Sequence, residues 1–259
     1  MYIYEYSLNL LMVIIPFPDR TVYSTMHRHM DTHETIVMSV GGSLIVPGQI
    51  DTDFLKILKA FIDVEIAEGR RFIIIAGGGR TARNYQEAAA AVSRLEHEDL
   101  DWMGIHATRL NGHLLRTIFR DSAYRIVITN PDEILDVPDD EKLVIAAGYR
   151  PGCSTDLRAI QIAERVGAKK IINLSNIDYV YTSDPNSDPD AKKIEVISWQ
   201  DFRNLIPSDW DPGLSSPFDP IAAKEAHEKG IEVAIINGNR PEALINYING
   251  REFVGTKIS

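Results

Sequence analysis

Glycine-rich turns follow three apolar runs of the chain, and each run has the composition of a buried strand. The turns are Gly41-Gly42-Ser43, Gly77-Gly78-Gly79 and Gly148-Tyr149-Arg150-Pro151-Gly152. Glycine lets a backbone come close to a ligand and present its N–H groups, and a helix that follows adds the positive end of its dipole. Two such turns after successive strands indicate a site for phosphate oxygens.

Two arginines follow the glycine triplet, at positions 80 and 83. We expect Arg83 to neutralise bound phosphate, whereas Arg80 is either a second phosphate ligand or a solvated surface charge. The spacing is neither that of the G-x-x-x-x-G-K-[ST] loop nor that of the G-x-G-x-x-G turn, so neither a P-loop nor a Rossmann cofactor site is indicated. Cys153 has no identifiable histidine partner, which favours a packing or neutral contact over a nucleophile.

The elements that position these turns alternate between apolar strands and helices from residue 35 onward. This order predicts an α/β protein, a three-layer αβα sandwich with a mostly parallel central sheet. The carboxyl ends of the strands, where such folds bind ligands, are where the turns lie. The expected strands are 35–40, 72–76, 124–129, 142–147, 169–174 and 231–236, and the expected helices are about 52–69, 80–94, 102–119, 155–167, 219–230 and 241–250.

The composition and charge of the chain disfavour some classes of binding partner. The chain has 259 residues and a formal net charge of −10, which disfavours binding of nucleic acid through its phosphate backbone. Its single cysteine excludes an intrachain disulfide and suits a reducing compartment. No apolar run reaches the roughly 18 residues of a membrane span. We therefore expect a soluble, cytoplasmic protein with neither nucleic-acid nor membrane partners.

Residues 1–33 lack the strand–helix order of the rest, and we expect an N-terminal extension there, either ordered or disordered. His27, His29 and His33 in this stretch are either metal ligands or, as we favour, part of a mobile tail.

The chain from about residue 35 to its end resembles the amino-acid kinase superfamily, and within it the uridylate (UMP) kinases of the archaeal-like type. The motifs that carry the resemblance are SVGGSLIVPG, AGGGRTARNY, DWMGIHATRLNGHLL, GYRPGCSTD, SNIDYVYTSDPNSDPDAKKI, FDPIAAK and VGTKI. The resemblance implies the amino-acid kinase fold and transfer of the γ-phosphoryl group of ATP to UMP, giving UDP for pyrimidine biosynthesis. It also implies Mg²⁺ with the ATP and a homohexamer. One domain, 34–259, would hold an acceptor lobe at about 34–165 and an ATP lobe at about 166–259.

The resemblance also implies roles for individual residues, and it assigns none of them to a separate metal site. Asp101, just before the helix expected at 102–119, would hold the ribose hydroxyls of UMP, and Asp219 would lie near the reaction centre. The implied catalytic residues are Gly42, Ser43, Arg83 and Asp156. The implied UMP-binding residues are Gly78, Asp101, Gly148, Tyr149, Arg150, Pro151, Gly152, Cys153, Ser154 and Thr155. The implied ATP-binding residues are Gly41, Gly42, Ser43, Gly79, Arg83, Ser175, Tyr181 and Asp184.

The sequence departs from the family pattern at several of these places. Ser39 stands where many members carry a lysine, and Tyr179 stands where a glycine is usual. Arg150, Cys153 and Arg158 replace more usual small or neutral residues around the acceptor segment. Either Arg158 faces solvent, which we favour, or it alters acceptor binding. These departures keep two alternatives open: a kinase of the same fold with a different phosphorylated acceptor, and a non-catalytic protein that stores ATP and oxyanions of the molybdate type.

Overall fold

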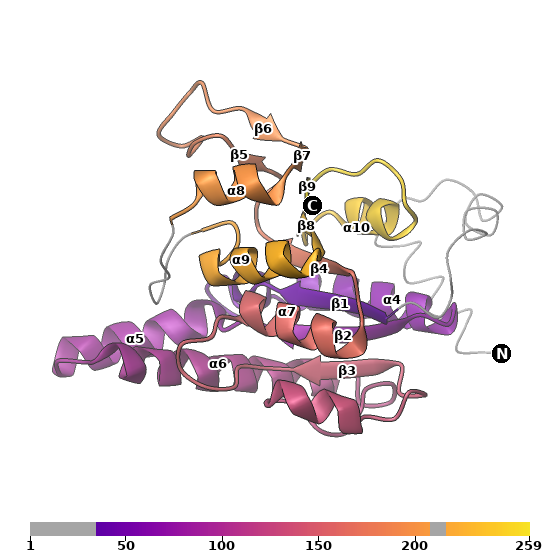
Figure 1. Cartoon of the computed structure of the whole chain (residues 1–259). Helices are drawn as coiled ribbons and strands as arrows, with labels where there is room; N and C mark the ends of the chain where they lie inside the picture. The colour runs from indigo at the N-terminus through magenta and orange to yellow at the C-terminus, as the bar shows by residue number, and fades with distance from the viewer. Residues whose placement is uncertain (1–34, 208–215) are drawn as a thin grey trace.

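A computed structural model of the protein describes residues 35–207 and 216–259 (Figure 1). The predicted extension at residues 1–33 and its three histidines lie outside the described residues.

The core of the fold is a seven-stranded sheet with the order β3-β2-β1-β4-β8-β9-β7. The first five strands of that order run parallel to one another, β9 runs antiparallel to β8, and β7 runs parallel to β9. This arrangement confirms the predicted mostly parallel sheet. The strand bounds are β1 (Thr35–Val40), β2 (Arg71–Ala76), β3 (Leu143–Ala146), β4 (Lys170–Ser175), β7 (Val196–Ile197), β8 (Glu232–Asn237) and β9 (Thr256–Ile258).

Helices cover both faces of the sheet, because the central strands are apolar on both sides. Along β2, Phe72 and Ile74 belong to one hydrophobic cluster and Ile73 and Ile75 to the other, as the two-residue period of a strand requires. One cluster includes residues of α4 (Thr52–Ala67), α6 (His97–Ile118) and α10 (Pro241–Ile248). The other includes residues of α7 (Thr155–Val166), α8 (Trp199–Leu205) and α9 (Pro220–Lys229). The three-layer prediction is therefore confirmed (Figure 1).

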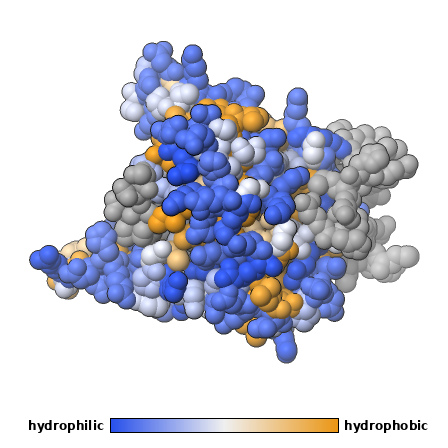
Figure 2. Space-filling view, in the orientation of Figure 1, coloured by the Kyte–Doolittle hydropathy of each residue, from blue (hydrophilic) through white to orange (hydrophobic). Residues whose placement is uncertain are grey.

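Helix α5 (Gly79–Val92) contains no buried residue, and Figure 1 shows it beside α6, with the pair extending beyond the sheet. Its alanine-rich sequence forms a helix without a core to pack against, since alanine has the highest intrinsic helix propensity. Figure 2 shows that the visible face of the molecule is mostly hydrophilic, with scattered apolar spots.

Several short elements were not predicted from the sequence. They are α3 (Gly42–Ile45), the 3₁₀ helix η1 (Pro131–Asp136), the paired strands β5 (Val180–Tyr181) and β6 (Lys193–Ile194), the strands β7 and β9, and the helix α8. The predicted turn-rich loop at 182–193 lies between β5 and β6, so it forms the end of an antiparallel hairpin.

Two predicted elements were placed wrongly. The helix expected at 102–119 begins at His97, because Glu96 and Asp99 form a capping box that starts it five residues earlier. Asp101 therefore lies inside the helix rather than before it. The strand expected at 124–129 is absent from the described structure. Only isolated bridges at Ala123 and Ile128 join this segment to β3, and bends separate them.

No helix in the described ranges is long and apolar enough to cross a membrane.

Candidate functional site

The first two glycine turns lie against each other, because β1 and β2 are neighbours in the sheet. The Gly77 N–H donates to the Val40 carbonyl at 2.9 Å. A Cβ atom added at Gly42 would lie 1.9 Å from the Gly79 nitrogen, and one at Gly77 would lie 2.3 Å from the Gly42 nitrogen. Gly79 also has a φ of +63°, which disfavours other residues. Gly42, Gly77 and Gly79 are thus required for the packing of the two turns.

The packed turns leave backbone donors free at the carboxyl edge of the sheet. The N–H groups of Gly42, Ser43, Gly78 and Gly79 donate to no other group within the described ranges. Gly42 begins α3 and Gly79 begins α5, so these donors lie at helix N-termini. Free N–H groups of this kind bind phosphate oxygens.

The two arginines after the triplet differ in their surroundings. The Arg80 guanidinium donates to the Glu87 carboxylate at 3.1 Å on the exposed side of α5. Arg83 is exposed, and it forms no ion pair or hydrogen bond with another residue that the structure describes. This contrast favours Arg83 as the arginine available to a ligand.

Two carboxylates meet beside the glycine turns. Asp156 lies in the first turn of α7, and Asp219 is the N-cap of α9. The Asp219 N–H donates to Asp156 Oδ2 at 3.2 Å, and the Ser39 hydroxyl donates to Asp156 Oδ1 at 3.3 Å. Asn173 Nδ2 also donates to Asp156 Oδ1, at 3.4 Å.

The environment of this pair favours protonation. Burial raises the pKa of Asp156 to about 7, and the nearby Asp219 charge adds to the shift, while the Asp219 N–H and the Ser39 hydroxyl oppose it. Burial likewise raises the pKa of Asp219. At neutral pH Asp156 is therefore partly protonated, and a cation bound beside it would favour the ionised form.

Sequence reasoning missed Asn173, and register explains its place. Ser39 and Asn173 are directly paired across β1 and β4, so both side chains point to the same face, toward α7. Asn173 is only 5% exposed within the apolar run of β4. A polar residue in the middle of a buried strand is the signal that could have identified it.

The segment 148–155, here called the acceptor loop, is held to α6 by its backbone. Thr108 Oγ1 accepts from the Gly148 N–H at 2.8 Å. Arg109 donates to the carbonyls of Gly148 and Tyr149, at 3.0 and 2.9 Å. Thr108 and Arg109 were also missed from the sequence, although Thr108 is buried among the polar positions of α6.

Helix α6 also reaches the second glycine turn. Asn111 Nδ2 donates to the carbonyls of Gly77 and Gly78, at 2.7 and 3.1 Å. At the other end of the acceptor loop, Asp101 Oδ2 accepts from the Gly152 N–H at 2.8 Å. One helix therefore fixes the acceptor loop and the glycine turn relative to each other. Asp101, for which the resemblance implied a contact with the ribose of UMP, here accepts a hydrogen bond from the loop backbone.

The rest of the acceptor loop leads into α7. Ser154 is the N-cap of that helix and accepts from the Leu157 N–H at 3.0 Å. Gly152 has a φ of +76° and open space where a Cβ would stand. Cys153 is a free, partly buried thiol.

The prediction that Arg158 faces solvent was wrong. The side chain is only 2% exposed, and its guanidinium carbon lies 5.1 Å from the centre of the Tyr149 ring. The exposed Arg150 contacts the same ring at 5.7 Å. Because Tyr149 and Cys153 of the acceptor loop lie against its guanidinium, the loop covers Arg158.

Three of the residues expected to bind ATP lie in the second half of the chain, namely Ser175, Tyr181 and Asp184. Ser175 ends β4, and its Cα lies 3.8 Å from the Cβ position of Gly41, so it adjoins the first glycine turn. Tyr181 ends β5. The Asp184 carboxylate accepts from the backbone and side chain of Asn186, at 2.9 and 3.0 Å, and so stabilises the hairpin loop.

An ion pair braces this side of the site. Arg240 donates to both oxygens of Asp178, each at 2.8 Å, and Asn237 donates to the same carboxylate at 2.7 Å. The hydrogen bonds from Arg240 hold the pKa of Asp178 below its usual value. Tyr179 follows Asp178, and the Lys193 ammonium lies 4.9 Å from the centre of its ring.

Within the described residues, no group of three or more His, Cys, Asp or Glu side chains is placed to hold a metal ion by itself.

Comparison with known proteins gives one consistent set of relatives. The sequence model of the Amino acid kinase family matches residues 34–237. A uridylate kinase of Methanospirillum hungatei is 34% identical over 226 residues, covering 87% of this chain and 94% of the relative. One of Pyrococcus abyssi is 34% identical over 217 residues, covering 83% and 96%. The crystal structure of a uridylate kinase from Archaeoglobus fulgidus superposes with a TM-score of 0.74 at 30% identity, covering 86% of this chain and 99% of that one.

Proposed function

The chain belongs to the amino acid kinase family, and we propose that it transfers the γ-phosphoryl group of ATP to UMP, giving UDP in pyrimidine nucleotide biosynthesis. The observation that carries the proposal is the pair of packed glycine turns with free N–H groups, flanked by the acceptor loop. The likeness to uridylate kinases over nearly the whole described chain supports UMP as the acceptor.

The proposed chemistry needs alignment and neutralisation of charge rather than a nucleophile. Phosphoryl transfer proceeds in line, with charge spread over the transferred group's oxygens. The free N–H groups of Gly42, Ser43 and Gly79 would bind those oxygens, and Arg83 would neutralise them. Asp156 would lie beside the reacting groups, where its ionisation responds to the charge that ATP brings.

Mg²⁺ would accompany the ATP, and the donor set at the site fits it. Asp156 and Asp219 are adjacent carboxylates near the free N–H groups, and Mg²⁺ is commonly held by one or two carboxylates together with phosphate oxygens and water. When bound, the ion would supply positive charge to the phosphates.

The two substrates would bind to different halves of the fold. We propose an acceptor lobe at about 34–165 and an ATP lobe at about 166–259. In the first, Gly78, Asp101 and the acceptor loop would bind UMP. In the second, Ser175, Tyr181 and Asp184 would bind ATP together with Gly41 and the other turn residues. A homohexamer and a cytoplasmic location remain predictions from the family.

An ADP-release assay with Mg-ATP tests the proposal against UMP, CMP, dCMP, AMP, GMP and no acceptor. We expect turnover confined to UMP. Turnover with a different acceptor would contradict the assigned substrate while leaving the reaction class intact. A folded protein that binds ATP without turning over any acceptor would contradict kinase activity, and molybdenum or tungsten found by elemental analysis would then indicate storage.

A further inference from the structure

Arg158 is a buried cation whose hydrogen-bonding capacity is only partly used. Its Nη1 donates to the Gln161 side-chain oxygen at 2.6 Å. Its Nε and Nη2 are buried and have no hydrogen-bond partner in the described structure. Burial lowers the pKa of Arg158, and the charge and hydrogen bonding of the adjacent Cys153 oppose that shift, so the thiol lies close to the guanidinium while Nε and Nη2 keep no partner.

Such an arrangement is costly, since a buried charge is normally paired and fully hydrogen-bonded. Arg70 shows the usual solution in the same chain. It is 6% exposed and donates to the Glu65 carboxylate and to Asn249. Arg158 has no carboxylate partner within the described ranges. A buried hydrogen-bond donor is expected to have an acceptor, and the described residues do not supply one for these donors of Arg158.

The position of Arg158 indicates where that acceptor comes from. The residue lies in the first turns of α7, directly after the acceptor loop, and helical side chains lean back toward the N-terminus. Its guanidinium stacks on Tyr149 and lies beside Cys153, both of them loop residues. The open donors are therefore beneath the segment proposed to surround the acceptor.

We propose, resting on the proposed UMP kinase activity, that Arg158 determines acceptor specificity by donating hydrogen bonds to the 4-carbonyl oxygen of uracil. A guanidinium can only donate. Uracil presents a carbonyl at ring position 4, whereas cytosine presents an amino group that also donates. Arg158 would therefore satisfy its free N–H groups with UMP and leave two donors opposed with CMP.

For the base to bind, the acceptor loop must move away from the edge of the Arg158 guanidinium. Tyr149 and Cys153 cover it in the structure. Gly152, next to Cys153, has a glycine-favoured φ of +76° and open space where a Cβ would stand, so the loop has room to shift on that side. The base edge then replaces the thiol as the neighbour of Arg158.

The test changes residue 158 and the acceptor base, separately and in combination, and compares the effects. The kcat/KM is measured for wild type and Arg158→Met with UMP, with CMP, and with the UMP analogue that lacks the 4-oxygen (2-pyrimidinone ribonucleoside monophosphate). Methionine keeps an unbranched apolar chain beneath Tyr149 but has no donor. We expect wild type to prefer UMP over the analogue by about 10- to 100-fold, the range for a hydrogen bond to a charged group. In Arg158→Met that preference should disappear, and the preference for UMP over CMP should fall by a similar factor.

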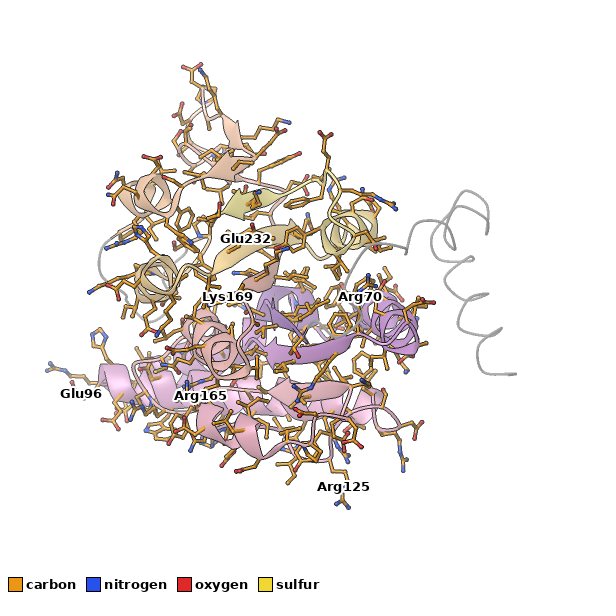
Figure 3. All side chains as sticks on the ribbon, turned by 45° about the vertical axis from the view of Figure 1, so that its right-hand side comes forward. Arg70, Glu96, Arg125, Arg165, Lys169 and Glu232 are labelled. Atoms are coloured by element: carbon orange, nitrogen blue, oxygen red, sulfur yellow. The ribbon has the colours of Figure 1, made fainter. Side chains whose placement is uncertain are left out.

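Arg165 supplies the matched control. It lies two turns further along α7 (Figure 3), and its guanidinium is paired with Asp132 at 2.5 Å. Arg165→Met should leave the UMP-to-analogue ratio unchanged. Equal losses for UMP and the analogue in Arg158→Met would overturn the proposal, because a residue that only supports the loop affects both.

The remaining outcomes also test whether Arg158 determines acceptor specificity. If Arg158→Met does not fold, Arg158→Leu, which also lacks a donor, replaces it. Wild-type enzyme that uses UMP and the analogue equally well overturns the proposal without any variant. If wild type phosphorylates UMP normally while the base preference survives the loss of Arg158, only this inference fails. If wild type does not phosphorylate UMP, the proposed function fails with it.

Discussion

Asp156→Asn should flatten the pH dependence of stability above pH 5. Burial and the charge of Asp219 raise the pKa of Asp156 from 3.8 to about 7. The folded protein therefore binds this proton more tightly than the unfolded chain does. Its contribution to stability is fully present below about pH 3.8 and is lost as the pH rises through 7.

The size of the effect follows from the shift. Three pKa units correspond to at most about 4 kcal/mol, of which less than 3 kcal/mol is lost between pH 5 and 8. Asp156 keeps part of its surface exposed, and solvent screening reduces the figure. We expect the wild type to lose about 2 kcal/mol of unfolding free energy over this range, relative to Asp156→Asn.

Urea unfolding at pH 5, 6, 7 and 8, at one protein concentration and without nucleotide, measures this difference. The variant also weakens the hydrogen bond from the Asp219 N–H, but that loss shifts its stability by a similar amount at every pH. Asp121→Asn, which changes a side chain 98% exposed, is the control and should follow the wild type. Parallel pH profiles for wild type and Asp156→Asn would refute the reasoning.

The turns and their arginines give two further predictions. Gly42→Ala should abolish measurable turnover and destabilise the fold by more than about 1–3 kcal/mol, because its Cβ would lie 1.9 Å from the Gly79 nitrogen; thermal unfolding with a kinetic assay checks this, and near-normal kcat would contradict it. Arg83→Met should lower kcat/KM by about 100-fold or more, whereas Arg80→Met, which breaks only an exposed pair with Glu87, should change it less than about 3-fold. Equal effects of the two substitutions would show that the arginines were assigned wrongly.

The fold was predictable because its signals are local and repeated. Alternation of apolar runs with helical periodicity located six helices and five strands of the structure. The errors occurred where a helix cap or tertiary contacts, rather than the hydrophobic pattern, determine where an element begins or whether it forms. The capping box at Glu96 and Asp99 extends α6 backward, and the bends that interrupt 124–129 leave only two bridges to β3. Neither feature changes the hydrophobic period on which the prediction was based.

The parts of the site that are formed by glycine turns were predictable from the sequence. The parts that depend on which side chains become buried were not. The turns could be found because the residue type itself carries the signal. Arg158 could not, because its helical position was compatible with solvent and only the path of the acceptor loop buries it. Asn173 depends on register, since its function arises from standing opposite Ser39. Thr108 and Asn111 hold loops that are distant in sequence, and a single sequence contains no record of those contacts.

Ser39 connects these observations. At this register a side chain points toward the Asp156 carboxylate, and a lysine there would pair with it and lower its pKa. The serine hydroxyl donates one hydrogen bond at 3.3 Å but brings no charge, so the carboxylate is left with a pKa of about 7. The positive charge required for phosphoryl transfer must then come from elsewhere. The structure offers the exposed Arg83 and the free N–H groups of the turns, and the proposed Mg²⁺ would supply the rest. On this reasoning the chain replaces a fixed cation on β1 by charge that arrives with the substrate, and the ionisation of Asp156 should couple to nucleotide binding.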